Sequence, residues 1–205
     1  MTRLARMMIY PIKSLSGVNV TKSEVLPSGG LRNDHRWAIV DEEGHFVNGK
    51  RTAAVHAIRA EYASGLNSVT LSHPAMPSGD FSFDDGRPAL SEWLSKALQL
   101  KCKLIENLET GFPDDLEAPG PTIVSSGTLE EVACWFSISP EEAHRRFRAN
   151  LVIEASEPFW EDRLVGEIGS PVPFTIGNIA WLGVNPCQRC VVPSRDSLTG
   201  VPQLG

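Results

Sequence analysis

The first 85 residues alternate between short apolar runs and polar turns, a pattern typical of a chain that folds mainly into β-strands. The runs are rich in β-branched and aromatic residues and occupy residues 4–12, 18–26, 37–41, 55–62, 68–72 and 81–83. Clusters of Gly, Pro, Asn and Asp separate them, and such clusters favour turns. Several short strands at this spacing predict a small barrel or sandwich.

After residue 86 the hydrophobic spacing becomes helical. Apolar residues recur at intervals of three and four, at Leu90, Trp93, Leu94, Ala97 and Leu98, which places them on one face of a helix. Pro88 suits the first turn of that helix.

Two polar pairs further along have the spacing of capping boxes, in which a Ser or Thr and a later Glu satisfy the first N–H groups of a helix. The pairs are Thr128 with Glu131 and Ser139 with Glu142. They predict short helices over residues 129–135 and 140–147.

Strand patterns return in the last third of the chain, at residues 151–154, 172–176 and 179–184. Gly177-Asn178 suits a two-residue hairpin turn between the last two. Residues 107–121 are rich in Asp, Glu, Gly and Pro. This segment predicts a boundary that divides the chain into residues 1–106 and 107–205.

The composition is that of an ordinary globular protein. Of 205 residues, 41% are hydrophobic, and 25 acidic against 19 basic side chains give a formal charge of −6. The acidic balance argues against a nucleic-acid partner, which would need a basic surface. No apolar run reaches the roughly 20 residues that cross a bilayer, and the first residues lack the apolar core of a signal peptide. We therefore expect a cytoplasmic protein with no nucleic-acid or membrane partner.

Four cysteines in such a chain are expected to be reduced thiols. Cys102 and Cys134 stand alone in apolar segments, where a buried hydrophobic role is expected. Cys187 and Cys190 instead form a Cys-x-x-Cys motif that contains Arg189.

The residues themselves leave the role of this motif open. A thioredoxin-like site needs a helix after the first cysteine, whereas Val191, Val192 and Pro193 favour an extended chain. A zinc site needs further ligands, and none of the five histidines has suitable spacing. A single thiolate could serve as a metal ligand or sulfur carrier, since Arg189 would lower the pKa of a neighbouring thiol. Purely structural cysteines remain the alternative.

Three other polar patches are candidates for binding. Lys13 and Ser14 follow an X-Pro turn and could hold an anion. Arg148 and Asn150 lie where the second short helix gives way to a strand, and could offer charge and amide hydrogen bonds. The acidic pair at residues 161–162 is typical of solvated surface. Taken alone, each patch is better explained by ordinary structure: a surface lysine after a turn, arginines at the C-terminal end of a helix, and a solvated acidic pair.

Taken in order, these patches resemble a MOSC domain preceded by a MOSC N-terminal β-barrel domain. The matching motifs are Tyr10-Pro-Ile-Lys-Ser-Leu-x-Gly, Gly30-Leu-x-x-Asp34-x-x-Trp37, Arg146-Phe-Arg-Ala-Asn150, Pro158-Phe-x-Glu-Asp162, Asn185-Pro-Cys-Gln-Arg-Cys190 and Asp196-x-x-Thr-Gly200. The resemblance implies a mainly β fold with short helices. It implies an N-terminal β-barrel-like domain (residues 1–106) packed on a MOSC β-barrel core (residues 107–205). Relatives continue through further strands, so this core would be truncated at its C-terminus.

The resemblance also implies a molybdopterin-type molybdenum cofactor in a cleft between the two parts. It makes Cys190 the molybdenum ligand and catalytic residue, with Cys187 the less favoured ligand. The residues that it implies bind the cofactor are Lys13, Ser14, His35, Arg36, Arg148, Asn150, Gln188 and Arg189. His35 departs from the family pattern, which usually has arginine after this aspartate.

The implied reaction is reduction of a small N-hydroxylated substrate, with electrons from a partner redox protein. Two alternatives are a sulfur carrier that uses a cysteine persulfide and a non-catalytic module that binds an anion or a partner. Because Lys13 and Cys190 would share one site, we expect the N-terminal third to pack against the rest of the chain.

Overall fold

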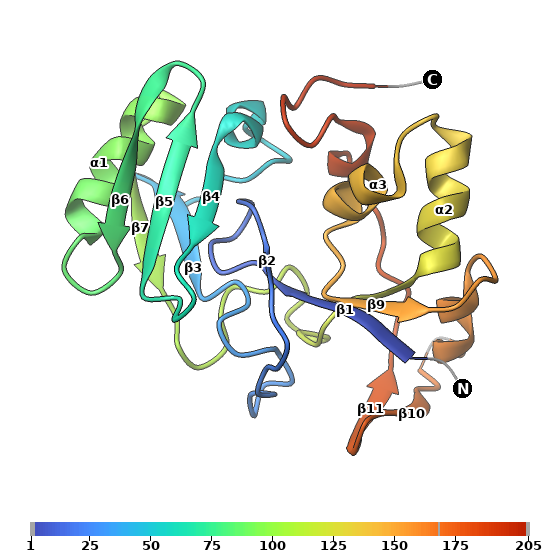
Figure 1. The fold of residues 1–205 in the computed structure, drawn as a ribbon. Helices are drawn as coiled ribbons and strands as arrows, with labels where there is room; N and C mark the ends of the chain where they lie inside the picture. Colours follow the sequence, from blue (N-terminus) through green and yellow to red (C-terminus); the bar gives the residue numbers. More distant parts are fainter. Residues whose placement is uncertain (1–2, 168, 204–205) are drawn as a thin grey trace.

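The computed structural model describes residues 3–167 and 169–203, which form two bodies (Figure 1). The first body contains an antiparallel sheet of β4 (Arg59–Tyr62), β5 (Ser68–His73) and β6 (Met76–Ser82). It also contains the antiparallel pair of β3 (Trp37–Asp41) and β7 (Cys102–Glu106). Helix α1 (Arg87–Leu98) packs against β6 and β7.

The core of the first body follows directly from the two periodicities in its sequence. Val69 and Leu71 alternate with more exposed residues along β5 and point inward, as strand geometry requires. Leu90 and Leu94 are one helical turn apart on α1 and are completely buried. The ring of Trp37 stacks on that of Phe83 at 3.9 Å. This core fixes the sheet and α1 as one unit.

The second body is built on a sheet with the order β2-β1-β9-β8. Its strands are β1 (Arg3–Ile9), β2 (Val18–Asn19), β8 (Ile123–Ser125) and β9 (Leu151–Glu154), and β1 pairs antiparallel with β9. Helices α2 (Ser126–Trp135) and α3 (Pro140–Phe147) pack on each other beside this sheet. The hairpin of β10 (Val172–Ile176) and β11 (Ile179–Gly183) lies below them in Figure 1.

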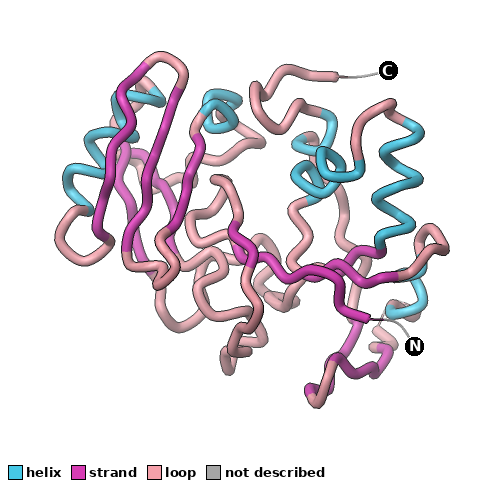
Figure 2. The backbone as a smooth tube through the Cα atoms, viewed as in Figure 1, coloured by secondary structure: helices cyan, strands magenta, loops and turns pink. Residues whose placement is uncertain are grey.

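The remaining elements are three short 3₁₀ helices, η1 (Ala53–Ala57), η2 (Trp160–Leu164) and η3 (Val192–Ser194). Long loops join the two bodies, and they include much of residues 10–36 and 107–122 (Figure 2). Because β1 and β2 lie in the second body, the chain passes from that body to the first and back. The boundary at residues 106–107 stays a prediction.

The predicted fold class, mainly β with short helices, is confirmed. Where the signals are local, the bounds agree with the prediction: residues 140–147 form α3, whose N-cap Ser139 accepts a hydrogen bond from the Glu142 N–H. The strands predicted at residues 37–41, 151–154 and 172–176 are also present. Gly177, at a φ of 62°, forms the predicted hairpin turn.

Several expectations about single elements were wrong. Helix α2 begins at Ser126 and is capped by Ser125, so the Thr128 pair is not its cap. The Thr128 hydroxyl instead donates to a carboxylate oxygen of Glu161 at 3.0 Å. Residues 18–26 contain only the two-residue β2. In the strand expected at residues 55–62, residues 55–57 belong to η1 and only residues 59–62 form a strand, β4. Strands β7 and β8 had not been predicted.

The two isolated cysteines have different environments. Cys102 is buried as expected, and burial raises the pKa of its thiol. Cys134 is exposed, against expectation. The inward face of α2 is formed by Leu129 and Ala133, and the next residue is turned about 100° away from that face.

The described residues contain no helix that is both long enough and apolar enough to span a membrane.

Candidate functional site

The C-terminal end of α3 is where the loop at residues 13–16 meets the second body. Arg148 caps this helix in the left-handed backbone region, at a φ of 55°. Its Nη1 donates to the Leu15 carbonyl at 2.7 Å, and its guanidinium lies 4.0 Å from the centre of the Tyr10 ring. A side-chain-bearing residue in this backbone region costs roughly 1–2 kcal/mol. The two contacts hold Arg148 there and join α3 to the N-terminal loop.

Lys13 is almost entirely buried beside this junction, at 6% exposure. Its ammonium group is 2.7 Å from a carboxylate oxygen of Asp114 and donates to the Phe112 carbonyl at 2.6 Å. Burial raises the pKa of Asp114, but the hydrogen bond and charge of Lys13, together with the charges of Lys50 and His35, outweigh it and leave that pKa below its usual value. Ser14 follows with a φ of 73°. Asp114 therefore already neutralises part of the positive charge of Lys13.

His35 also lies against Tyr10. Its ring stacks on the Tyr10 ring with centroids 6.2 Å apart, and its Nδ1 is 3.0 Å from a carboxylate oxygen of Asp34. Burial opposes ionisation of Asp34, yet His35 and the Tyr10 N–H keep its pKa below the usual value. Burial also raises the pKa of Tyr10 to about 12. Tyr10 is thus a neutral ring that contacts both His35 and Arg148.

Two of the implied cofactor-binding residues are already fully engaged. The guanidinium of Arg36 donates twice to Glu106, at 2.8 and 2.5 Å, and lies over the Trp37 ring. The side-chain oxygen of Asn150 accepts from the Thr122 N–H at 3.1 Å, and its amide donates to the Met8 carbonyl at 3.2 Å. Asn150 lies directly before β9, so its side chain connects this strand to β1 and to Thr122, the residue before β8.

The Cys-x-x-Cys segment crosses the end of α3. Arg189 donates from Nη1 to the Phe147 carbonyl at 3.2 Å, and its guanidinium lies 4.4 Å from the Phe147 ring centre. Cys187, Gln188 and Cys190 are exposed. The Cys190 sulfur accepts a hydrogen bond from the Val192 N–H at 3.4 Å.

Contacts through Tyr10, Leu15 and Phe147 thus connect the segments that carry one group of the predicted residues. The residues on these segments are Lys13, Ser14, His35, Arg148, Arg189 and Cys190. Arg36 and Asn150 instead face structural partners. The expected packing of the N-terminal third against the rest of the chain is confirmed by the Lys13 and Arg148 contacts.

Two basic residues beside this group were missed by the sequence reasoning. His56 lies in η1, and Arg195 follows η3. The Nε2 of His56, the Nε of Arg195 and the Nη2 of Arg148 are all shielded from solvent without a hydrogen-bond partner among the described residues. No local pattern marks His56, whereas Arg195 lies between two of the motifs quoted above.

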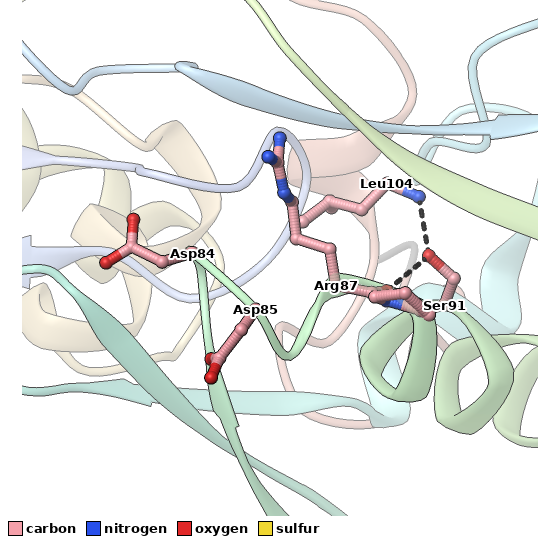
Figure 3. A pocket seen from close by; sticks show the side chains of 6 residues that line it. Asp84, Asp85, Arg87, Ser91 and Leu104 are labelled. Atoms are coloured by element: carbon pink, nitrogen blue, oxygen red, sulfur yellow. Dashed lines mark hydrogen bonds between the residues drawn. The ribbon is translucent and has the colours of Figure 1, made fainter.

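Other parts of the described structure contain weaker candidates for a functional site. They contain no group of three or more His, Cys, Asp or Glu side chains that could hold a metal ion, so a zinc site built from several such ligands is not present there. A surface depression at the start of α1 is lined by Asp84, Asp85, Arg87 and Ser91 (Figure 3). In that depression the Ser91 hydroxyl donates to the Arg87 carbonyl and accepts from the Leu104 N–H. The depression is separate from Cys190.

The sequence matches the family model described as the MOSC N-terminal beta barrel domain over residues 1–137. The chain belongs to this family. Among curated proteins it is 25% identical to a molybdenum cofactor sulfurase of Danio rerio, over 96% of this chain and 28% of that protein. It is 23% identical to mitochondrial amidoxime reducing component 2 of Bos taurus, over 97% of this chain and 68% of that protein. The chain spans less than a third of the sulfurases that it matches.

The residues at the end of α3 fit the chemistry of a phosphate-bearing metal cofactor. Such a group needs cationic N–H donors for its phosphate and a soft thiolate for its metal. Arg148 has a buried Nη2 without a partner among the described residues, and Cys190 has an exposed sulfur. Lys13 fits less well, because its ammonium is already paired with Asp114.

Proposed function

We propose that the chain binds a molybdopterin-type molybdenum cofactor between Arg148 and Cys190 and reduces N-hydroxylated compounds. The observation that carries the proposal is the unsatisfied Nη2 of Arg148, in a side chain that joins the loop at residues 13–16 to the helix crossed by the Cys190 segment. The amidoxime-reducing relative supports the reaction class.

Each nearby side chain has a definite part in this proposal. Cys190 would hold the metal through its sulfur, which also accepts a hydrogen bond from the Val192 N–H. Arg148 would bind the phosphate, with Ser14 beside it. Arg189 anchors the cysteine segment to Phe147, and His35 lies against the same Tyr10 ring as Arg148.

When bound, molybdenum supplies two-electron redox chemistry. The substrate takes up two electrons and two protons, its N–O bond breaks, and the oxygen leaves as water. The electrons come from a partner redox protein. The exposed position of Cys190 leaves room for a substrate to approach the metal ligand.

The test compares Cys190→Ser with Cys187→Ser in protein from a host that makes the cofactor. A serine hydroxyl stays protonated near neutral pH and is a hard ligand, so Cys190→Ser should lose nearly all bound molybdenum. Cys187→Ser should keep most of it. Metal content and the fluorescence of oxidised pterin are measured per folded protein, with circular dichroism as the folding control. Full retention of metal in Cys190→Ser would refute the proposed ligand.

A sulfur carrier is the second candidate, because Cys187 and Cys190 are both exposed and the sulfurase relatives are named for the molybdenum cofactor. The same preparation distinguishes the two functions. Cyanide-labile sulfur without stoichiometric molybdenum would favour a persulfide carrier, and absence of both would favour a non-catalytic binding module.

A further inference from the structure

We infer that the outer edge of β11 pairs with the β11 edge of a second copy of this chain and forms a symmetric dimer. The inference goes beyond the proposed function, because it concerns association and requires neither metal nor cofactor. Its starting point is the hairpin of β10 and β11, which forms a separate two-stranded sheet within the described part of the chain. A sheet of this size is marginally stable by itself, and its outer edges carry unpaired N–H and C=O groups.

The register of the hairpin determines which backbone groups of β11 face outward. Pro173 lies opposite Leu182, and Thr175 lies opposite Ala180. Because proline has no N–H, Pro173 and Leu182 cannot exchange two hydrogen bonds, and bonded and non-bonded pairs alternate along an antiparallel ladder. The N–H and C=O groups of Ala180 and Leu182 therefore point away from β10. The described residues provide no backbone hydrogen-bond partner for them.

The two edges of the hairpin are not equivalent. On the β10 edge, Pro173 removes one donor, and η2 packs against this strand. On the β11 edge, Ala180 and Leu182 keep both donors and both acceptors. Natural edge strands are commonly protected by proline or by charged side chains, and β11 contains neither. The unprotected edge is therefore that of β11.

The hairpin is attached to the second body through one face. Ile176 and Trp181 pack against the apolar cluster of Ile9 and Leu151. The side chain of Leu182 lies on the opposite face and is exposed. In Figure 1 the hairpin projects from the lower side of the second body. The packed face thus holds β11 in position while its outer edge stays accessible.

The chemistry of this edge suits a second copy of β11. The sequence has no charged side chain between Glu167 and Arg189, so two β11 strands can approach without the repulsion that like charges cause across a sheet. In an antiparallel arrangement around a two-fold axis at Trp181, Ala180 of each copy lies opposite Leu182 of the other. Each such pair exchanges hydrogen bonds in both directions, and two-fold symmetry is the commonest form of self-association. The outer face, which carries the Leu182 side chain, stays exposed in the combined sheet.

The first test measures association of the full chain. An edge-to-edge contact between short strands is small, so the dimer should be weak and dependent on concentration. Sedimentation velocity between about 5 µM and about 1 mM should show a shift from monomer toward dimer, with a Kd inside that range. A chain that remains monomeric up to about 1 mM would overturn the inference and would favour a strand of another protein at this edge.

Amide hydrogen exchange followed by NMR locates the contact within the hairpin. The amides of Ala180 and Leu182 should exchange several-fold more slowly at the highest concentration than at the lowest, because pairing occupies them. The amide of Thr175 points outward on the β10 edge and should exchange at the same rate at both concentrations. Dimerisation without slower exchange at Ala180 and Leu182 would place the contact elsewhere and refute the inference.

Proline substitutions on the two opposite edges give a matched pair of variants. Ala180→Pro removes the outward N–H of β11, and Thr175→Pro removes that of the residue directly opposite on β10. Ala180→Pro should weaken dimerisation by about tenfold or more, whereas Thr175→Pro should dimerise as the wild type does. Equal effects of the two substitutions would contradict pairing through the β11 edge.

The amide of Trp181 faces β10, and its slow exchange serves as the folding control for both variants. If either proline substitution abolishes that protection, the hairpin itself has opened, and the concentration dependence of exchange in the wild type decides. None of these measurements depends on molybdenum, so failure of the proposed function would leave them intact.

Discussion

The first body and the segment after β9 are held in place by different forces. In the first body a continuous core surrounds Trp37, with Leu71, Leu90 and Leu94 fully buried. In the described part of residues 155–203, only Gly200 is buried. This second segment carries Cys187 and Cys190. Apolar burial therefore stabilises the first body, whereas the segment that carries Cys187 and Cys190 is held in place mainly by other contacts.

The C-terminal part of the second segment, residues 195–203, is held by polar contacts to α3 and to β4. Glu142 accepts hydrogen bonds from the Ser197 N–H at 2.9 Å and the Ser197 hydroxyl at 2.6 Å. Arg146 binds both Glu142 and Gln203, and Arg59 reaches the Leu198 carbonyl. Segments held mainly by such contacts open locally at lower free energy than a core does. Functional loops commonly combine a rigid scaffold with a weaker attachment of this kind.

The largest expected difference comes from making the same substitution in both regions. Leu71→Ala in β5 should lower the free energy of unfolding by about 2–5 kcal/mol, since it leaves a cavity. Leu182→Ala in β11, where the leucine is 61% exposed, should change it by less than about 0.5 kcal/mol. Urea unfolding followed by circular dichroism measures both. If both substitutions lowered the free energy of unfolding by similar amounts, Leu182 would be buried in solution, and the two regions would not differ as described.

The next largest effect is expected at Glu142. Burial raises the pKa of this carboxyl group, but hydrogen bonds from Ser197 and Arg146 outweigh it and lower the pKa from 4.5 to about 2. Glu142→Gln removes the charge opposite the buried Arg146 and should cost about 3 kcal/mol. The matched control is Glu154→Gln, in an exposed pair with Arg3, which should cost less than about 1 kcal/mol.

The direction of the pKa shift of Glu142 determines how its contribution to stability changes with pH. Because the folded pKa of Glu142 lies below the unfolded value, its contribution is complete above about pH 5 and is lost as the pH falls from 4.5 to about 2. The difference in unfolding free energy between wild type and Glu142→Gln should shrink over that range. A difference that stays constant down to pH 2 would contradict the ion-pair role of Glu142.

The smallest effect on global stability is expected at Arg189, which anchors the cysteine segment from an exposed position. Arg189→Gln should lower the unfolding free energy by less than about 1 kcal/mol. It should nevertheless speed thermolysin cleavage near residues 191–192 several-fold, because local opening of this segment becomes easier. Arg3→Gln serves as the exposed control. A matching increase in that variant would show that cleavage reports global unfolding.

Sequence reasoning predicted the elements whose signals are local. Ser139, Pro140 and Glu142 define the start of α3 within four residues, and the Gly177-Asn178 turn defines its hairpin. Strand β7 was missed because its pairing with β3 joins residues 61 to 69 positions apart, from Asp41 with Cys102 to Trp37 with Glu106. Such pairing depends on tertiary packing and leaves a weak local pattern.

The candidate site shows the same limit. The family motifs carry Lys13, Arg148 and Cys190, and the structure brings their segments together. Nothing in the sequence shows that Asp114 pairs with Lys13 or that Thr122 and Met8 occupy the amide of Asn150. His56 was missed because its position near the segment after Cys190 arises only when η1 folds against that segment.

The position of β1 affects how the protein is made. β1 precedes β9 in synthesis, yet Arg3 pairs with Glu154 and Met7 with Leu151. At roughly 5–20 residues per second, a ribosome needs roughly 8–30 s to extend the chain from one strand to the other. During that interval β1 is without its main partner, and its free edge is open to pairing with other chains. Chaperone capture of the nascent chain should therefore be strongest before residue 154 emerges.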